Sequence, residues 1–400
     1  MERVAENEGA FGTEEYSGRI ERVRAQMRAR DLGALAITTP ENIYYLVGLN
    51  HQGYFAFTML VLPLEGEPLL VTRAMEQVVI SAQTTGIGFR GYSEDEDAGD
   101  AATRAIEAAG CAGERVGIDT SSMFFPPGVW EAMEQGLPGV EWIDTSRTSS
   151  VDPSFRAGLV DNVRLVKTDA EIACVRRAAA VSDRAVRAGL AAAGVGVNET
   201  EVAAAIYDAM VHGGGEYPGF VPFIRSTETL QEEHTTWRNH VLTAGEQLFI
   251  ELSGSYARYH APLGRMGHIA RAPQGSERLR AVAVGAIEAA RDALRPGVVS
   301  GDVYASWQAA VDEGLGHSRL RRHHCGYNVG IGFPPSWVGS STVLGLRPGG
   351  RVPIEQNMVF HLWAWIHDED VGDYLLSDSA VVTEGGAELL TTTPRPLVVD

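Results

Sequence analysis

The stretch GEQLFIELSGSYARYHAPLGR, residues 245–265, contains the pattern that decides the fold of the second half of the chain. Its first part, QLFIELSG at 247–254, predicts a β-strand because apolar side chains alternate along it. Successive side chains of a strand point to opposite faces, so Leu248 and Ile250 share one face and Glu251 lies on the other. A buried carboxylate needs a partner, which makes Glu251 the first candidate for a functional residue.

Segments around this strand predict an α+β layer fold. Helical periodicity covers 169–193, 199–212 and about 275–295, and strand patterns lie between and after these helices. Helices and strands segregated in this way are typical of α+β domains. The further predicted strands are MGHIARA at 266–272, GYNVGIGF at 326–333, NMVFHLWAWI at 357–366 and YLLSDSAVVTE at 374–384.

The first part of the chain alternates helical and strand patterns instead. Helical spacing from about residue 16 to 30 precedes a buried-strand pattern at 32–38, and 59–72 predicts a hairpin. A mixed sheet with helices on its faces satisfies this order. A long amphipathic helix with Thr168 as its expected N-cap then begins the next domain. We expect a smaller α/β domain over 1–160 and a second domain over 161–400.

Composition excludes several classes of function. The formal net charge of -19 argues against nucleic acid or an anionic membrane as a partner. Neither a membrane-spanning apolar run nor a secretion signal is recognisable, so we expect a cytoplasmic protein. The three cysteines have no paired spacing, which suits a reducing compartment and predicts neither a disulfide framework nor a zinc site.

Sequence motifs for common cofactors and catalytic centres are also missing. The chain contains no P-loop, no dinucleotide fingerprint, no GxSxG and no HExxH, so we expect no cofactor. Polar and aromatic residues instead concentrate on the predicted strands of the second domain, which suggests a pocket inside a curved sheet. They are His234, Glu251, His260, Tyr327, His361, Trp363 and Asp378.

Several of these segments resemble the pita-bread superfamily, which includes aminopeptidase P, prolidase, methionine aminopeptidase and creatinase. VRLVKTDAEI at 163–172, residues 245–265, HHCGYNVGIGF at 323–333, NMVFHLW and LLSDSAVVTEGGAELL follow its order of motifs. YLVGL at 45–49 extends the resemblance to the first domain. The resemblance implies a pita-bread C-terminal domain after a smaller creatinase-type α/β domain.

The metal-ligand positions of that superfamily are mostly replaced here. A proline offers no donor atom, an indole is a donor only, and a neutral Tyr or Ser is a poor substitute for an imidazole or carboxylate. One carboxylate does not hold a two-metal site, so we expect no catalytic metal. By resemblance the five positions are Glu251, Pro262, Tyr327, Trp363 and Ser377.

Within the superfamily the chain most resembles the metal-free ectoine hydrolases. The features are GGGEYPGFVPFI at 213–224, HTTW at 234–237, RYHAPLGR at 258–265, GYNVGIGFPPSW at 326–337 and VFHLW at 359–363. The chain departs from that pattern at Ser336 and at Leu375, where acidic residues are expected. The resemblance implies ring opening of ectoine or 5-hydroxyectoine to N-acetyl-2,4-diaminobutyrate.

Three residues are the catalytic candidates. His234 aligns with the catalytic histidine of the creatinase pattern, and imidazole exchanges protons near neutral pH; the alternative is a simple loop histidine. Glu251 could hold the amidinium, direct water or attack the ring carbon, or it could form a salt bridge with Arg258 or Arg265. His361 could bind a substrate carboxylate, stabilise charge at the reacting carbon or be a core histidine.

The substrate-binding candidates have structural alternatives as well. His260 and Arg265 are candidates for a substrate carboxylate, but the first could be a core histidine and the second could pair with Asp378. Tyr327 and Trp363 offer cation-π surface or simply fill the vacant metal cavity. The complete set is His260, Arg265, Tyr327, Phe333, Trp337, Trp363, Asp378, Tyr54 and Phe55.

The resemblance also implies partners. In similar metal-free enzymes the N-terminal domain of one protomer closes the pocket of its neighbour, so we expect a homodimer in which Tyr54 and Phe55 have that role, unless they are ordinary sheet residues. A deacetylase is expected to act on the product. Two rival functions stay open: a creatinase-like hydrolase of another amidino or amide substrate, and a non-catalytic binding protein on a retired peptidase fold.

Overall fold

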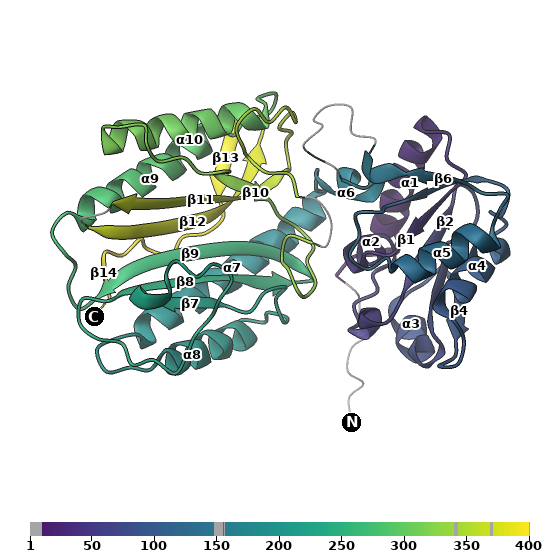
Figure 1. Ribbon diagram of the computed structural model, residues 1–400, viewed down its shortest axis with the longest axis horizontal. Helices are drawn as coiled ribbons and strands as arrows, with labels where there is room; N and C mark the ends of the chain where they lie inside the picture. Colours follow the sequence, from purple (N-terminus) through teal and green to yellow (C-terminus); the bar gives the residue numbers. More distant parts are fainter. Residues whose placement is uncertain (1–9, 148–154, 156, 340–342, 369–370, 400) are drawn as a thin grey trace. The chain divides into compact units, whose positions relative to one another are not determined.

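The computed structural model describes residues 10–147, 155, 157–339, 343–368 and 371–399. The chain divides into two compact units, 1–164 with 339–342 and 165–338 with 343–400 (Figure 1). The division lies between Arg164 and Leu165, a short way beyond the boundary predicted at residue 160. No helix in the described ranges combines the length and apolar character needed to cross a bilayer.

The first unit is an α/β layer structure, as predicted. Its mixed sheet has the strand order β4-β3-β2-β1-β5-β6. The hairpin predicted at 59–72 is confirmed, since β2 and β3 pair antiparallel with Met59 opposite Val71. The strands are β1 Ala34–Ile37, β2 Met59–Pro63, β3 Leu69–Arg73, β4 Gly88–Tyr92, β5 Arg115–Ile118 and β6 Glu141–Asp144.

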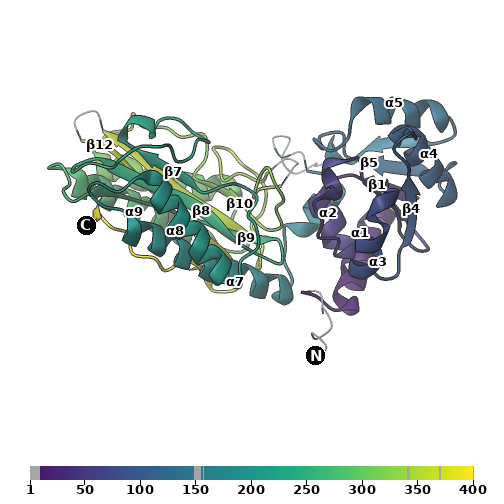
Figure 2. The same ribbon diagram turned by 90° about the horizontal axis from the view of Figure 1, so that it is seen from below.

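Helices cover both faces of that sheet (Figures 1 and 2). Helix α2 starts with Pro40 at its first position and ends at Gly48, whose φ of 76° gives the left-handed C-cap that glycine adopts without strain. The helices of the unit are α1 Thr13–Ala29, α2 Pro40–Val47, α3 Gln77–Gln83, α4 Ala98–Ala108, α5 Pro127–Gly136 and α6 Leu159–Arg164.

The second unit is built on a curved, mainly antiparallel sheet with the strand order β10-β11-β12-β9-β8-β7. Strands β8 and β9 form its central hairpin, and the turn places Ala257 and Arg258 at positive φ. The strands are β7 Phe223–Ser226, β8 Gln247–Tyr256, β9 Tyr259–Ile269, β10 Gly326–Asn328, β11 Val359–Asp368, β12 Gly372–Thr383, β13 Gly386–Leu389 and β14 Val398–Val399.

Four helices of the described chain pack along one face of this sheet (Figure 2). Helix α7 packs on β8 and β9, and α9 packs on β11 and β12. The N-cap predicted at Thr168 is confirmed, because its hydroxyl accepts from the Glu171 N–H and the Glu171 carboxylate accepts from the Thr168 N–H. The helices are α7 Asp169–Ala192, α8 Glu199–His212, α9 Ser276–Ala293 and α10 Ser300–Leu315.

Three details differ from the predicted elements. Helix α10 was not predicted, because its glycine and polar residues weaken the helical pattern of 300–315. Of the strand predicted at 266–272, residues 266–269 are the end of the longer strand β9. Of the strand predicted at 326–333, residues 326–328 form β10, and Ile331 makes an isolated bridge with Tyr259. The predicted α+β layer architecture itself is confirmed.

Candidate active site

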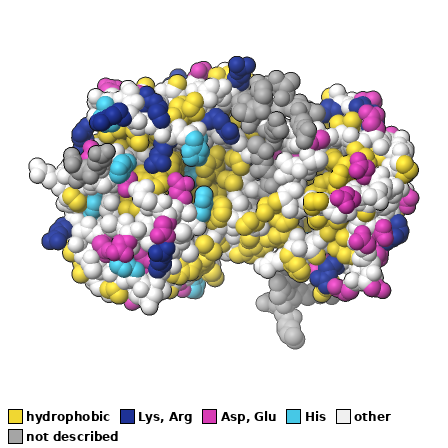
Figure 3. Space-filling model, in the orientation of Figure 1, with side chains coloured by type: hydrophobic (Ala, Val, Ile, Leu, Met, Phe, Trp, Pro, Cys, Tyr) yellow, Lys and Arg dark blue, Asp and Glu magenta, His cyan; other side chains and the backbone are white. Residues whose placement is uncertain are grey.

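A cavity of about 150 Å³ lies on the face of the second unit's sheet that the helices leave open. The face in Figure 3 shows histidine side chains around apolar surface in this unit. The cavity contains five of the candidate residues, His234, Glu251, Tyr327, Trp337 and Trp363. The other lining residues are Phe220, Phe223, Arg225, Glu233, His323, His324 and Trp365.

Alternation along the central strand decides which side chain reaches the cavity. Leu248 and Ile250 are fully buried in the core that β8 forms with α7 and α8, so Glu251 points to the opposite face. Strand pairing places Glu251 opposite Gly264 and Gly264 opposite Ser377, so these three residues form one row across the cavity face of the sheet. A Cβ on Gly264 would lie 2.6 Å from the Ser377 Oγ and 3.2 Å from the Phe249 ring, so this position requires glycine.

The side chains at the metal-ligand positions in this region decide whether a metal centre fits. Of the five ligand positions, Pro262 offers no donor and Trp363 offers only an indole N–H. The Tyr327 hydroxyl is occupied by two hydrogen bonds, to His361 and from Trp337. Within the described part of the chain, no group of three or more His, Cys, Asp or Glu side chains is arranged to hold a metal ion. The donor set therefore does not fit the two-metal centre of the peptidases.

Burial makes Glu251 an unusual carboxylic acid. Its relative exposure is 8%, and this desolvation is the main reason that its pKa rises to about 7. The positive charge of Arg225 lowers the pKa, and the charge of Glu233 raises it. A carboxyl group with this pKa exchanges a proton at neutral pH, which suits acid-base or nucleophilic work. No ion pair with Arg258 or Arg265 forms among the described contacts of Glu251.

Two hydrogen bonds lead from the cavity wall to His361, the neighbour of Glu251. The Trp337 indole N–H donates to the Tyr327 hydroxyl at 3.2 Å, so the Tyr327 proton is free to bond to His361 Nδ1 at 2.9 Å. His361 then has its own proton on Nε2, which lies 3.7 Å from a Glu251 oxygen. Burial lowers the pKa of His361 to about 3, so the ring stays neutral and faces Glu251 as a donor.

His234 lies at the rim of the same cavity. Its φ of 60° is in the left-handed region, which costs a non-glycine residue about 1–3 kcal/mol. The imidazole stacks on Phe220 with ring centroids 6.2 Å apart and meets the edge of Phe223 at 6.0 Å. An exposed imidazole held by two rings beside a buried carboxyl group is placed to exchange protons with solvent.

Several lining residues were not predicted. Arg225 and Phe223 alternate with Ile224 on β7 and therefore face the cavity, and Trp365 follows Trp363 at the same two-residue spacing. Strand alternation could have identified them. His324 had no such signal, because it precedes its strand; burial, followed by the charge of His323, lowers its pKa to about 4.

Two candidates lie on the helix side of the sheet instead. Arg265 pairs with Ile250, so it points away from Glu251, and it forms an ion pair with Asp378 at 2.7 Å. Both side chains are only 1% exposed. The structure does not bring Arg265 and Asp378 to the cavity, and the alternative of a mutual pair is the one that it shows.

His260 and Phe333 are also outside the lining of the cavity. His260 is completely buried: its Nε2 accepts from the Gly219 N–H and its Nδ1 donates to the Arg258 carbonyl, both at 2.9 Å. Burial lowers its pKa to about 3. Phe333 packs beneath the Arg258 guanidinium at 4.5 Å. The two residues shape the loops next to the cavity.

Tyr54 and Phe55 belong to the first unit, in a short 3-10 turn at Gly53–Phe55. Tyr54 packs edge-on against Phe124 with ring centroids 5.8 Å apart, and Phe55 is 77% exposed. Their contact with a neighbouring protomer stays a prediction.

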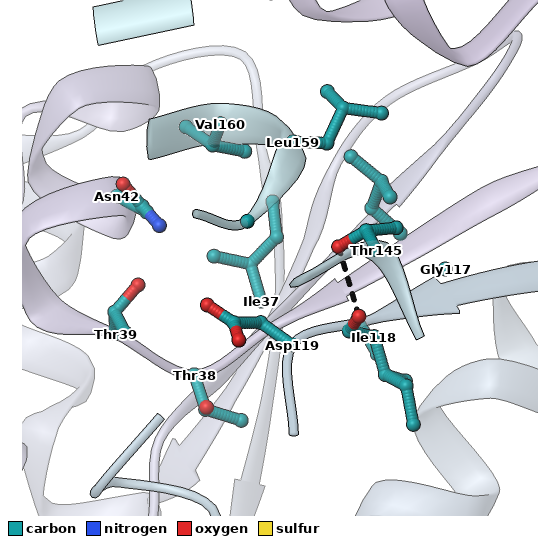
Figure 4. Close-up of a pocket in the computed structure, with 13 residues that line it drawn as sticks. Ile37, Thr38, Thr39, Asn42, Gly117, Ile118, Asp119, Thr145, Leu159 and Val160 are labelled. Carbon is teal, nitrogen blue, oxygen red and sulfur yellow. Dashed lines mark hydrogen bonds between the residues drawn. The ribbon is translucent and has the colours of Figure 1, made fainter. Parts of the chain in front are cut away.

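The first unit has a small cavity of its own at the ends of β1 and β5 (Figure 4). The Asp119 carboxylate lies there among Thr38, Thr39 and Asn42. Burial, followed by the charge of Asp161, raises the pKa of Asp119 to about 6. With a volume of about 20 Å³ the cavity has room for a single water molecule.

Comparisons with known proteins agree with this architecture. The sequence profile of metallopeptidase family M24 matches residues 173–384, and that of the creatinase/prolidase N-terminal domain matches 19–166. The chain is 28% identical to an uncharacterised hydrolase/peptidase, y4tM, of Sinorhizobium fredii, covering 97% of this chain and 98% of the relative. It is 27% identical to the ectoine hydrolase of Halomonas elongata, again covering 97% and 98%.

Solved structures show the same fold. The dipeptidase PepE of Mycobacterium ulcerans superimposes with a TM-score of 0.79 at 23% sequence identity, covering 97% of this chain and 99% of the other. The family profile spans more than half of the chain and includes the strands that line the cavity, β7, β8, β10 and β11. The chain therefore belongs to metallopeptidase family M24.

Proposed function

We propose that the protein is a metal-independent hydrolase that opens the ring of a small cyclic amidine, ectoine or 5-hydroxyectoine, to N-acetyl-2,4-diaminobutyrate. The observation that carries the proposal is Glu251, a buried carboxyl group with a pKa of about 7 in a cavity walled by aromatic rings. The similarity to the ectoine hydrolase of Halomonas elongata over 97% of the chain supports it.

The size and walls of the cavity favour such a substrate. About 150 Å³ is smaller than the roughly 300–1,000 Å³ of pockets for drug-sized ligands, so a small ring fits better than a peptide. A cationic amidinium is attracted to the faces of Tyr327, Trp337 and Trp363 by about 0.5–2 kcal/mol per contact. The ionised Glu251 carboxylate supplies the opposite charge.

The chemistry is hydrolysis of one carbon-nitrogen bond. Glu251 acts at the amidine carbon, water supplies the oxygen that this carbon gains, and His234 transfers a proton to the departing ring nitrogen. His361 turns its Nε2 toward the Glu251 carboxylate at 3.7 Å, where a proton on Nε2 favours the ionised form of Glu251. The product retains its acetyl group, so a deacetylase is expected to follow, and a homodimer is expected in which the first unit covers the pocket of the partner.

The test is incubation of purified, EDTA-treated protein with ectoine, followed by NMR. Ring opening to the acetylated diaminobutyrate, unchanged on adding Mn²⁺ or Co²⁺, supports the proposal. An intact substrate with correctly folded protein contradicts it. Reaction in ¹⁸O-water under single-turnover conditions then tests for a covalent intermediate. Label in Glu251 shows that the carboxylate attacked the ring carbon and that water cleaved the intermediate at the Glu251 carboxyl carbon. Label in the product alone fits water attack at the substrate carbon, with or without a covalent intermediate.

A second candidate is hydrolysis of an acyclic amidino substrate such as creatine. Ser336 and Leu375 favour it, because they replace the acidic residues expected from the ectoine hydrolase pattern. Creatine and a panel of dipeptides in the same assay separate this activity, and peptidase activity, from ectoine hydrolysis. Binding of intact ectoine without turnover is the result expected of a retired enzyme.

A further inference from the structure

We propose that Arg225 forms an anion subsite at one end of the cavity, where it binds the carboxylate of a substrate whose amidinium faces Glu251. The inference rests on the proposed function and narrows its substrate class to small amidines that also have a carboxylate. Arg225 takes the place of His260, His361 and Arg265, the residues first considered for that carboxylate.

The guanidinium of Arg225 is buried and lines the cavity. Its relative exposure is 4%, and it stacks on Phe249 at 4.9 Å and Trp365 at 5.9 Å. Its Nη1 donates to the carbonyl groups of Leu230 at 2.9 Å and Glu232 at 3.1 Å, which holds the side chain in place. The buried Nε has no hydrogen-bond partner in the part of the chain that the structure describes.

The charge of Arg225 is only partly balanced by the protein. Glu251 and Glu233 act on it electrostatically, but within the described ranges neither forms an ion pair with it. Glu251 is protonated for part of the time at neutral pH, which removes some of that compensation. A buried cation with neither an ion-pair partner nor a full set of hydrogen bonds favours binding of an anion.

Strand register places the anion subsite beside the reacting carboxyl group. Phe223 is opposite Glu251, and Arg225 is opposite Phe249. Arg225 therefore lies on the same face of the sheet as Glu251, two residues further along β7 than Phe223. The offset along the strand is two residues, or roughly 7 Å. A small ring with an amidine at one side and a carboxylate at the other spans two such groups.

The nearby Arg322 strengthens this end of the cavity. Its guanidinium stacks on Trp365 at 4.4 Å and on Trp363 at 5.4 Å, and its Nε also has no hydrogen-bond partner among the described residues. Two cations that both contact the Trp365 ring favour a negatively charged ligand there. Glu233, which also lines the cavity, repels a second carboxylate and so limits the ligand to one.

The experiment compares matched ligands by isothermal titration calorimetry on the unmodified protein. The pairs are ectoine with its carboxamide and creatine with its amide. We expect the carboxylate of the better-binding pair to bind roughly 10–100-fold more tightly than the neutral analogue, because a charged hydrogen bond is lost. Equal affinities within both pairs, or no binding of any of the four, overturn the inference.

Variants assign the preference to Arg225. In Arg225→Met the ratio between carboxylate and carboxamide should fall to near one, whereas Arg225→Lys should retain part of it. Arg238→Gln is the matched control, since Arg238 is a 54% exposed cation of the neighbouring loop that pairs with Glu232; it should retain the full ratio. A full ratio in folded Arg225→Met contradicts the assignment, and if that variant does not fold, Arg225→Lys decides.

Failure of the inference is separable from failure of the proposed reaction. If the protein prefers the carboxylate ligand but does not turn over ectoine, the proposed reaction is contradicted and the anion subsite is supported. Turnover of ectoine and its carboxamide with equal kcat/KM leaves the reaction and removes the subsite.

Discussion

Two sets of buried charges lie on opposite faces of the second unit's sheet. On the helix side, Asp378 accepts hydrogen bonds from Arg265, Thr391 and Arg395 at 2.7–3.0 Å, so its charge is fully matched. On the cavity side, Glu251 faces His361 Nε2 at 3.7 Å and Arg225 without an ion pair among the described contacts. Charges satisfied within the protein stabilise the fold, whereas the unmatched ones are available to a substrate.

The largest expected effect is on the cavity side. Glu251→Gln keeps the shape of the side chain and removes its acid-base and nucleophilic capacity, so kcat should fall about 10²–10⁴-fold. Because the buried carboxyl group has a raised pKa, the variant should be at least as stable as the parent at pH 8. Steady-state assays and urea unfolding measure both quantities. Full activity of the variant contradicts the proposed role of Glu251.

The opposite result is expected for Asp378→Asn. The substitution leaves Arg265 without its buried counter-charge, and the free energy of unfolding should fall by about 3–5 kcal/mol. The kcat of the molecules that remain folded should not change, because Asp378 does not line the cavity. Urea unfolding and active-site titration measure the two effects; a specific loss of kcat contradicts the division between the two faces.

The pH dependence of stability sharpens the comparison. The pKa of Glu251 is about 7 in the folded protein against an ordinary value of 4.5, so the folded state binds the proton more tightly. The resulting stabilisation is fully present below about pH 4.5 and is lost as the pH rises through about 7. The unmodified protein should lose about 3 kcal/mol relative to Glu251→Gln over this window. If the difference in free energy of unfolding between the unmodified protein and Glu251→Gln is the same at every pH, the pKa of Glu251 is not raised.

The pH dependence of activity should have the opposite sign to that of stability, although Glu251 is responsible for both. The ionised form of Glu251 acts at the amidine carbon, so kcat/KM should rise as the pH increases through about 7. A pH profile that is flat from 6 to 8 contradicts this assignment.

A smaller effect is expected from the hydrogen-bond chain. Tyr327→Phe removes the donor to His361 Nδ1, and with it the preference for a proton on the Nε2 that faces Glu251. We expect kcat/KM to fall about 10-fold, the value of one hydrogen bond, and the acid limb of the pH profile to shift. The control is Tyr374→Phe, whose hydroxyl donates to the Pro396 carbonyl at 2.8 Å outside the cavity; it should lower stability only.

The smallest effect separates two neighbouring serines of β12. The Ser377 Oγ is buried without a hydrogen-bond partner among the described residues, whereas the Ser379 Oγ donates to the Pro262 carbonyl at 2.8 Å. Ser377→Ala should leave stability unchanged or raise it by up to about 1 kcal/mol, and Ser379→Ala should lower it by about 1 kcal/mol. Equal losses of stability for Ser377→Ala and Ser379→Ala in thermal unfolding contradict the expected difference between the two serines.

Strand alternation explains both the successes and the errors of the site prediction. Applied to β8, it separated Glu251 from Ile250 and indicated the cavity face. Applied equally to β9, β7 and β11, it would have removed Arg265 from the substrate-binding set and added Arg225 and Trp365. His260 escapes this rule, because it lies on the cavity face of β9 but at the far end of the strand, where backbone groups occupy both ring nitrogens.

The sequence by itself determined the architecture and the absence of a peptidase metal-ligand set. Periodicity is local, and the identity of the residues at the ligand positions, above all Pro262 and Trp363, needs no coordinates. Only the tertiary structure decided which charges are matched. The pair of Arg265 with Asp378 joins residues 113 positions apart in the chain. That Arg225 forms no ion pair within the described ranges depends on how β7 pairs with β8. Burial, which raises the pKa of Glu251, likewise exists only after the strands have assembled.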